Sequence, residues 1–224
     1  MPVRLATSIS SNKSKQGTEV TAKIMQDIPL PEGQKIPKGS QVRGKVVAIS
    51  PTSASAKSEI SVRFDKLLLK HVEIALITNL RAIAGFVEVE EAQIPVHGSG
   101  ESDVYDWLPT RQIGGDDVYG KEGTVTAWNN PSQVVGRSTY DGVLGHISSQ
   151  AGTSCRGPLY GNDMPQALWV FSSDACGVYG LPYMTIAHAG RNEPLGLIVL
   201  RSSHPSLKLP GGTGMLLRID QIGN

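Results

Sequence analysis

The 224-residue sequence lacks any apolar run long enough to cross a bilayer as a helix. Its longest runs, such as Leu67–Leu69 and Leu195–Leu200, fall far short of the roughly 20 residues that a spanning helix requires. It also lacks an excess of either charge, because 21 Lys and Arg residues stand against 20 Asp and Glu residues. No overall field therefore draws the chain to nucleic acid or to an anionic membrane. We expect neither a transmembrane helix nor a nucleic-acid partner.

Cysteine is also scarce, with only Cys155 and Cys176 in the whole chain. Neither belongs to a Cys-x-x-Cys pair or has a His at metal-ligand spacing. The preferred interpretation is a disulfide, which on the chain-entropy model stabilises the fold by roughly 3 kcal/mol. The alternative is a pair of buried free thiols. A disulfide would place the protein in an oxidising compartment, the periplasm or the extracellular space.

The N-terminal residues Met1–Leu5 do not contain the apolar core of a secretory signal. We expect either a cytosolic protein or an exported one whose signal has been removed. The disulfide favours the exported protein.

Glycine and proline are abundant, with 25 and 14 residues, which favours turns over long helices. The first part of the chain shows alternation typical of half-buried strands in Val3–Leu5, Val20–Ile24, Gln41–Ile49 and Ile60–Asp65. The last two form a long hairpin. Next, 67–77 is ambiguous between strand and short helix, and 78–89 is expected to be a strand. The fold class is therefore all-β, with a small β-barrel.

The composition changes near residue 90. Residues 91–206 contain 11 acidic and 6 basic residues, all three Trp, all six Tyr, both Cys and 16 of the 25 Gly. We interpret 91–206 as an irregular β module inserted into a barrel formed by 1–90 and 207–224. The last strand, Met215–Ile219, should close that barrel. The only candidate helix in the module is Met164–Phe171, which fits a strand equally well.

An aromatic-rich segment of the middle module, 166–180, surrounds Cys176. Its large apolar residues are expected to form the core of the module. The functional alternative is an aromatic contact surface, since Trp and Tyr are common interface anchors. The residues that could form such a binding surface are Trp107, Trp128, Trp169 and Tyr179.

No motif for catalysis, metal binding or a cofactor is complete. The five histidines are scattered without ligand spacing, at His71, His97, His146, His188 and His204. Ser99 lies between glycines but lacks the spacing of a nucleophile elbow. Asp116, Asp117 and Asp163 do not follow the pattern of a calcium loop. Gly211–Gly214 precedes a strand and is better explained as a hairpin turn than as a phosphate loop. We therefore assign no catalytic residue, no metal and no cofactor.

A resemblance covers about residues 3–85. The residues that carry it are Val3–Ser11, Gly17, Val20–Ile24, Asp27, Ile28, Ile36–Ser40, Gly44 and Ile60–Leu67, with Gly214–Asp220 as a closing strand. This pattern is similar to the C-terminal β-barrel of TrbI-like proteins, the periplasmic scaffold of type IV secretion and conjugation machines, and to stand-alone secreted bacterial domains. The resemblance implies a structural barrel without catalytic residues. The chain departs from that family in having no proline-rich linker, inner-membrane helix or apolar helical hairpin.

These observations predict an exported, non-catalytic structural or assembly protein of the bacterial envelope or extracellular space. Its partner would be a second copy or another envelope protein. The first strand could join subunits by strand addition through Pro2, Val3, Arg4, Leu5, Ala6 and Thr7. The alternative for this segment is an ordinary edge strand within the monomer.

Two other functions stay open. One is an extracellular carbohydrate- or peptide-binding module that uses exposed aromatic rings. The other is a hydrolase that uses acids such as Asp103, Asp106, Asp116 or Asp117, although the spacing shows no paired-carboxylate geometry.

Overall fold

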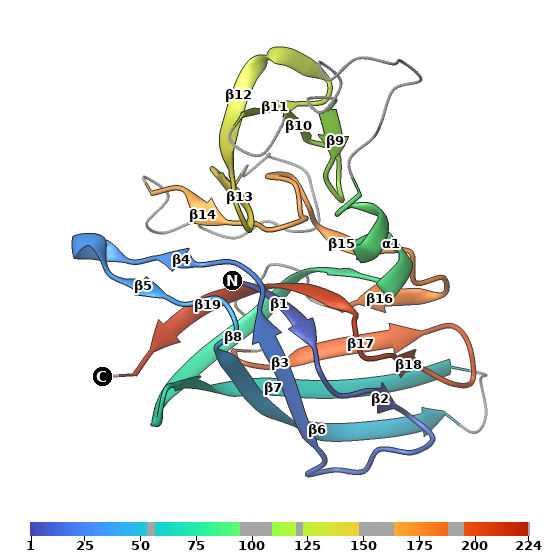
Figure 1. Cartoon of the computed structure of the whole chain (residues 1–224). Helices are drawn as coiled ribbons and strands as arrows, with labels where there is room; N and C mark the ends of the chain where they lie inside the picture. The colour runs from blue at the N-terminus through green and yellow to red at the C-terminus, as the bar shows by residue number, and fades with distance from the viewer. Residues whose placement is uncertain (53–56, 95–108, 120–122, 148–163, 188–194, 224) are drawn as a thin grey trace.

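The structure is a computed structural model that describes residues 1–52, 57–94, 109–119, 123–147, 164–187 and 195–223. Its regular elements are nearly all strands, as the sequence predicted (Figure 1). In chain order they are β1 (Pro2–Leu5), β2 (Ile9–Ser10), β3 (Glu19–Ile24), β4 (Ile28–Pro29), η1 (Pro31–Gly33), β5 (Lys35–Ile36), β6 (Gln41–Thr52), β7 (Lys57–Leu69), β8 (Val72–Ala84), α1 (Phe86–Glu91), β9 (Pro109–Arg111), β10 (Asp117–Tyr119), β11 (Thr124–Ala127), β12 (Asn130–Thr139), β13 (Gly142–Gly145), β14 (Gln166–Ala167), β15 (Gly177–Tyr179), β16 (Met184–Ile186), β17 (Ile198–Ser202), β18 (Lys208–Leu209) and β19 (Gly214–Ile222).

Six antiparallel strands close into a barrel. Their order is β8-β19-β1-β3-β6-β7, and a further pairing between β7 and β8 completes the circle. The final strand β19 lies between β1 and β8, which confirms the expected closure by the C-terminal segment. Short strands β2 and β18 pair with each other, as do β4 and β5.

The hairpin of β6 and β7 has the longest run of paired residues in the barrel, and its alternating pattern explains why it forms. Ile60, Val62 and Phe64 point into the core and are buried. A register shift interrupts the pairing between Arg43 and Gly44, which is typical of a β-bulge. At this point a side-chain carbon on Gly44 would overlap the carbonyl oxygen of Arg63, so the close approach of the two strands requires glycine.

The first strand does not have the free edge that the sequence suggested. Val3 pairs with Met215 of β19 on one side and with Ile24 of β3 on the other. Ala6 and Thr7 follow the strand and bond to Thr21. The prediction of an assembly strand over Pro2–Thr7 is therefore wrong for the folded chain, because both edges of β1 are already paired.

Strands from the middle of the chain extend the barrel sheet. Strand β17 pairs with β7, β16 pairs with β17, and β15 adds in parallel to β8. All three lie within 91–206, the region interpreted as an inserted module. That region therefore shares a sheet with the barrel.

Helix α1 stands where the last third of a strand over 78–89 was expected. Strand β8 ends at Ala84, and Gly85 begins the helix in an extended conformation. A side-chain carbon on Gly85 would lie 2.8 Å from the carbonyl oxygen of Gly180, so the chain turns at a crowded point. In the ambiguous Met164–Phe171 segment, the structure has the short strand β14 and no helix.

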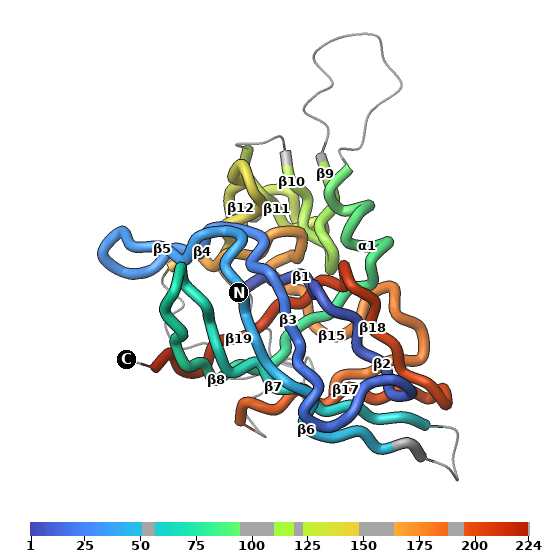
Figure 2. The backbone as a smooth tube through the Cα atoms, turned by 60° about the horizontal axis from the view of Figure 1, so that its bottom comes forward, coloured from blue at the N-terminus to red at the C-terminus, as the bar shows by residue number. Residues whose placement is uncertain are grey.

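A second sheet of six strands, in the order β14-β13-β12-β11-β10-β9, packs against the barrel. Figures 1 and 2 show this sheet on one side of the barrel, with α1 next to β9. A second apolar core joins the two parts and includes Ala84, Val89, Leu168, Phe171 and Leu216. Residues 166–180 thus contribute buried core residues, as expected from their composition.

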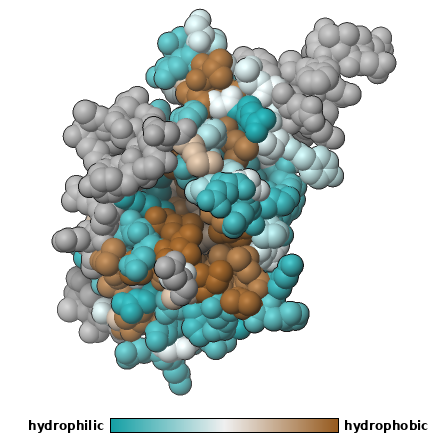
Figure 3. All heavy atoms as spheres, turned by 90° about the vertical axis from the view of Figure 1, so that its left-hand side faces the viewer, coloured by the Kyte–Doolittle hydropathy of each residue, from teal (hydrophilic) through white to brown (hydrophobic). Residues whose placement is uncertain are grey.

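Part of the barrel surface is apolar. Leu30, Leu69 and Ile74 pack against the barrel core while remaining partly exposed. Figure 3 shows a group of apolar side chains in the middle of one face of the molecule, surrounded by hydrophilic ones. Among the described residues, no helix has both the length and the apolar character needed to span a membrane.

Candidate functional site

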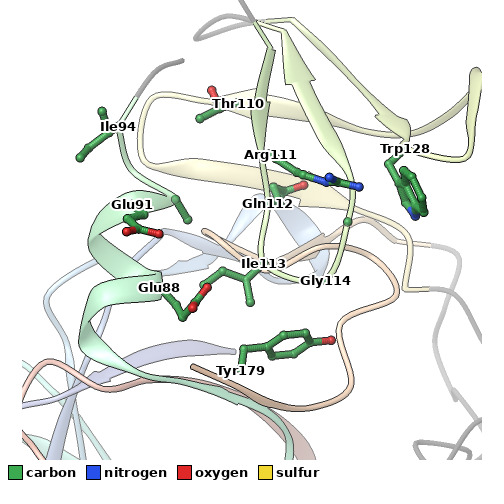
Figure 4. A pocket seen from close by; sticks show the side chains of 12 residues that line it. Glu88, Glu91, Ile94, Thr110, Arg111, Gln112, Ile113, Gly114, Trp128 and Tyr179 are labelled. Carbon is green, nitrogen blue, oxygen red and sulfur yellow. The ribbon is translucent and has the colours of Figure 1, made fainter. Parts of the chain in front are cut away.

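An open cleft of about 580 Å³ lies between α1 and the β9–β10 hairpin, within the size range of ligand sites. In Figure 4, α1 forms one wall with Glu88 and Glu91, the hairpin forms the back, Tyr179 lies at the floor and Trp128 at the far rim. The cleft is thus built where the outer strand of the second sheet faces the helix that follows the barrel strand β8.

A second cavity of about 310 Å³ adjoins the cleft. Both cavities are lined by Ala92, Thr110 and Gln112. They therefore meet at β9 and together form an elongated groove. Its second part extends across the second sheet, since Val118, Ser138 and Val143 also line it. Lys38 and Asp141 line the second cavity and form an ion pair at 2.5 Å between Nζ and Oδ1, so these two charges compensate each other.

The edge of β9 that faces α1 has no partner strand, because β9 is the last strand of its sheet among the described residues. The Gln112 N–H donates to the Asp116 carbonyl, so Gln112 points its backbone groups toward β10. Backbone groups alternate along a strand, and Ile113 accordingly points the other way, where Val170 and Ser172 bond to it. By the same alternation, the N–H and C=O of Arg111 point to the free edge.

Gln112 carries a buried polar atom without a partner. Its Nε2 donates to the carbonyl oxygens of Trp169 (3.2 Å) and Phe171 (2.7 Å), which fixes the orientation of the amide. Its Oε1 accepts no hydrogen bond from the described residues, although Gln112 is only 6% exposed. Such orphan acceptors are rare in folded proteins. This oxygen is enclosed, so a donor in the groove would reach it only after the side chain moves.

Charged and aromatic side chains line the cleft unevenly. Neither Glu88 nor Glu91 forms an ion pair or side-chain hydrogen bond with another described residue, whereas Glu90, which does not line the cleft, pairs with Arg4. The Arg111 guanidinium lies over the Trp128 ring, 4.6 Å from its centroid. In Figure 4 Arg111 extends toward Trp128 and away from α1. The wall formed by α1 is therefore negatively charged.

The hairpin that carries β9 is anchored by a buried carboxylate. Asp116 Oδ2 accepts a hydrogen bond from the Ser173 N–H at 2.5 Å. Arg81 supports the same loop, since its Nε donates to the Ala175 carbonyl at 2.9 Å. Gly114 has φ +101°, and a side-chain carbon there would lie 2.5 Å from Ser172 Oγ and 3.0 Å from the Ala175 Cα, so the position favours glycine. Burial raises the pKa of Asp116, while its bonds to Ser173 oppose the shift.

We expect Asp116→Asn to change the pH dependence of stability. The pKa of Asp116 is higher in the folded state, so the folded state holds the proton more tightly than the unfolded state. The wild type should therefore lose stability from this group as pH rises from about the ordinary Asp value, 3.8, through the raised pKa. Asn keeps an acceptor for Ser173 and does not ionise. We expect the free energy of unfolding of the variant to increase relative to that of the wild type as pH rises. Urea unfolding between about pH 3.5 and 7 measures this difference.

The control for this prediction is Asp116→Ala, which removes the acceptor and leaves the Ser173 N–H unpaired. Its free energy of unfolding should be about 1–3 kcal/mol lower than that of the Asn variant at every pH, since neither replacement ionises. A constant difference between the Asn variant and the wild type across the pH range would contradict the prediction.

The structure brings together only some of the residues proposed from the sequence. Trp128 is 57% exposed and lines the cleft with Tyr179. Trp169 is only 5% exposed and belongs to the second core, although it also lines the second cavity. It is held inside because 166–175 crosses between the two sheets. Trp107 lies outside the described residues.

The remaining candidates do not form a site among the described residues. The part of the chain that the structure describes contains no group of three His, Cys, Asp or Glu side chains able to hold a metal. Asp116 is bonded to Ser173, and Asp117 lies on β10 opposite Arg111. The candidates outside the described residues are His97, Ser99, Asp103, Asp106, Cys155, Asp163 and His188. The Cys155–Cys176 disulfide accordingly stays a prediction.

Sequence reasoning missed most of the residues that line the cleft, among them Glu88, Glu91, Arg111 and Gln112. The signal for the first two was the acidic cluster at 88–91, which fits a short helix better than a buried strand. Nothing local marks Arg111 or Gln112, because their role depends on which strand ends the sheet.

The fold and the cleft define an all-β protein with a closed six-stranded barrel and a groove along the outer strand of a second sheet. No family model matches the chain, and neither curated proteins nor solved structures match it. The resemblance to TrbI-like barrels therefore stays a prediction. The function has to be inferred from the site itself.

Proposed function

We propose that the protein is a non-catalytic binding module that takes an extended peptide segment by strand addition to β9. The free edge of β9 in the groove carries this proposal. Unpaired backbone groups of an edge strand provide hydrogen bonds to an incoming strand, and alternate side chains then give specificity. The peptide would be a segment of another envelope protein, so the chain would serve in assembly by accepting a strand.

The groove geometry supports a chain-like ligand. Its two cavities meet at Thr110 and Gln112, so a ligand that occupies both must be elongated. The enclosed Oε1 of Gln112 would accept a hydrogen bond from such a ligand once the side chain moves. A hydrolase has less support, because Asp116 and Asp117 do not belong to the described residues that line the cleft.

An exported location is part of the same proposal. It depends on the disulfide between Cys155 and Cys176, which would persist only in an oxidising compartment such as the periplasm or the extracellular space.

Arg111→Pro should abolish strand addition while the protein still folds. Proline has no N–H, and its ring occupies the free edge, yet edge strands tolerate it. We expect the variant to bind capped eight-residue peptides at least about tenfold more weakly than the wild type, since one backbone hydrogen bond is worth about 1 kcal/mol and the ring also blocks the edge. Fluorescence polarisation with the full chain measures this.

The matched control is Arg111→Ala, which removes the same side chain but keeps the N–H. It should bind peptides within about threefold of the wild type, a difference below about 1 kcal/mol. Circular dichroism of both variants checks the fold. Equal binding by the proline and alanine variants would show that the β9 edge is not used.

One observation favours a carbohydrate-binding module as the second candidate. The exposed ring of Trp128 could stack on a sugar beside the hydrogen-bonding side chains of the cleft. A glycan array run beside the peptide screen distinguishes carbohydrate binding from peptide binding. Binding of glycans alone, lost in Trp128→Ala and kept in Arg111→Pro, would replace the peptide proposal.

A further inference from the structure

We infer, on the basis of the proposed function, that the bound peptide presents a Lys or Arg side chain to the α1 wall of the cleft. Glu88 and Glu91 lie three residues apart on α1 and both line the cleft. Residues at this spacing share one face of a helix. Figure 4 shows the Glu88 side chain directed toward Ile113 at the centre of the cleft.

The two carboxylates have no cation of their own in the described part of the chain. The nearest helix acid, Glu90, is paired with Arg4 at 2.5 Å, which shows that α1 can hold ion pairs where a base is supplied. Arg111 is the one cation among the described residues that line the cleft, and its guanidinium is engaged with the Trp128 ring. The cleft therefore offers two negative charges that a ligand can neutralise.

Unpaired Glu88 and Glu91 also cost the helix some stability. Like charges one turn apart repel each other. Glu91 lies in the last turn, where the helix dipole disfavours negative charge. An arrangement that weakens the free protein is consistent with a role in binding.

The orphan oxygen of Gln112 is the independent observation that points to a donor-bearing ligand. Gln112 lines the same cleft, and Figure 4 shows it on the hairpin that faces α1. Both carboxylates and this amide oxygen accept hydrogen bonds, so the acceptors match an ammonium or guanidinium group. A Ca²⁺ ion would require about six to eight oxygen ligands, more than these three side chains supply.

The test compares three pools of capped eight-residue peptides that differ only in one fixed residue, Lys, Gln or Glu. The full-length wild type should bind the Lys pool about tenfold more tightly than the Gln pool, and the Glu pool more weakly still. The Lys preference should shrink as salt rises from about 50 to 500 mM, because partly exposed charges are screened. Equal binding of the Lys and Gln pools would overturn the inference.

The variant Glu88→Gln/Glu91→Gln should lose the Lys preference and keep its affinity for the Gln pool. Its melting temperature should stay the same or rise by about 1 °C, since a repulsion is removed. The control Glu90→Gln removes a charge from the same helix outside the cleft and should leave the Lys preference unchanged. Loss of the preference in the control alone would contradict the assignment to Glu88 and Glu91.

The outcomes separate this inference from the proposed function. If no pool binds, strand addition to β9 fails and the inference fails with it. If all pools bind equally and Arg111→Pro abolishes binding, only the cationic preference is wrong. Calcium binding by isothermal titration that the double variant loses would also overturn the preference for a basic side chain.

Discussion

Gly44→Ala should lower the free energy of unfolding by about 3 kcal/mol or more, a large share of the roughly 5–15 kcal/mol typical of a folded domain. The added carbon would overlap the Arg63 carbonyl oxygen and lie 2.8 Å from the Phe64 Cα. These are backbone atoms of β7, so no side chain can rotate away. The two strands of the longest barrel hairpin would have to separate. Urea unfolding followed by circular dichroism measures the loss.

Gly17→Ala is the matched control for this change. Gly17 also lies in the barrel region and has φ +85°, but a side-chain carbon there would contact nothing within 4 Å. The control should cost only about 1 kcal/mol, the strain of an unfavourable backbone conformation. If the Gly44→Ala variant proved as stable as the Gly17→Ala variant, the bulge would be able to relax and the prediction would be wrong.

Phe171→Ala should destabilise the protein by about 3–5 kcal/mol, the usual cost of removing a fully buried aromatic ring. Phe171 is fully buried, and its backbone forms a parallel bridge with Ile113 of the cleft hairpin. A side-chain carbon added to Gly214 would lie 3.5 Å from the Phe171 Cζ. The ring therefore packs against β19 and links the second sheet to the barrel. The cavity left by the missing ring should therefore increase local opening at the cleft hairpin as well as destabilise the core.

Chemical unfolding and amide hydrogen exchange test this prediction together. The Ile113 and Ser172 amides, which donate to the carbonyls of Val170 and Ile113, should lose protection in the variant. Trp128→Ala is the control, since that ring is mostly exposed and its removal should cost less than about 1 kcal/mol. A Phe171 variant with unchanged exchange at these amides would show that the cleft does not depend on this core.

Much of the barrel was predictable from local patterns. The alternation in 20–24 and in the hairpin 41–65 corresponds to β3, β6 and β7, because strands with one buried face repeat every two residues. The closing role of the C-terminal strand was also correct. The helix over 86–91 was missed, because a single buried residue, Val89, gives too short a segment for helical periodicity.

The candidate site was only partly predictable. Trp128 and Tyr179 were identified as surface aromatics from residue type, and they do line the cleft. Trp169 has the same residue type and is buried, since exposure depends on which segments cover it. The acidic wall and Gln112 become part of one cleft only because β9, α1 and 169–171, which are distant in sequence, pack together.

The sequence by itself determined the all-β class, the strands of the main hairpin and the absence of long apolar runs, because these follow from composition and from residues near each other in the chain. The tertiary structure decided the rest. It paired β1 on both sides, joined β15, β16 and β17 to the barrel sheet, and left β9 as the outer strand beside α1 among the residues that the structure describes. Pairing between strands is set by contacts distant in sequence, so neither a free edge nor the groove beside it is visible in local patterns.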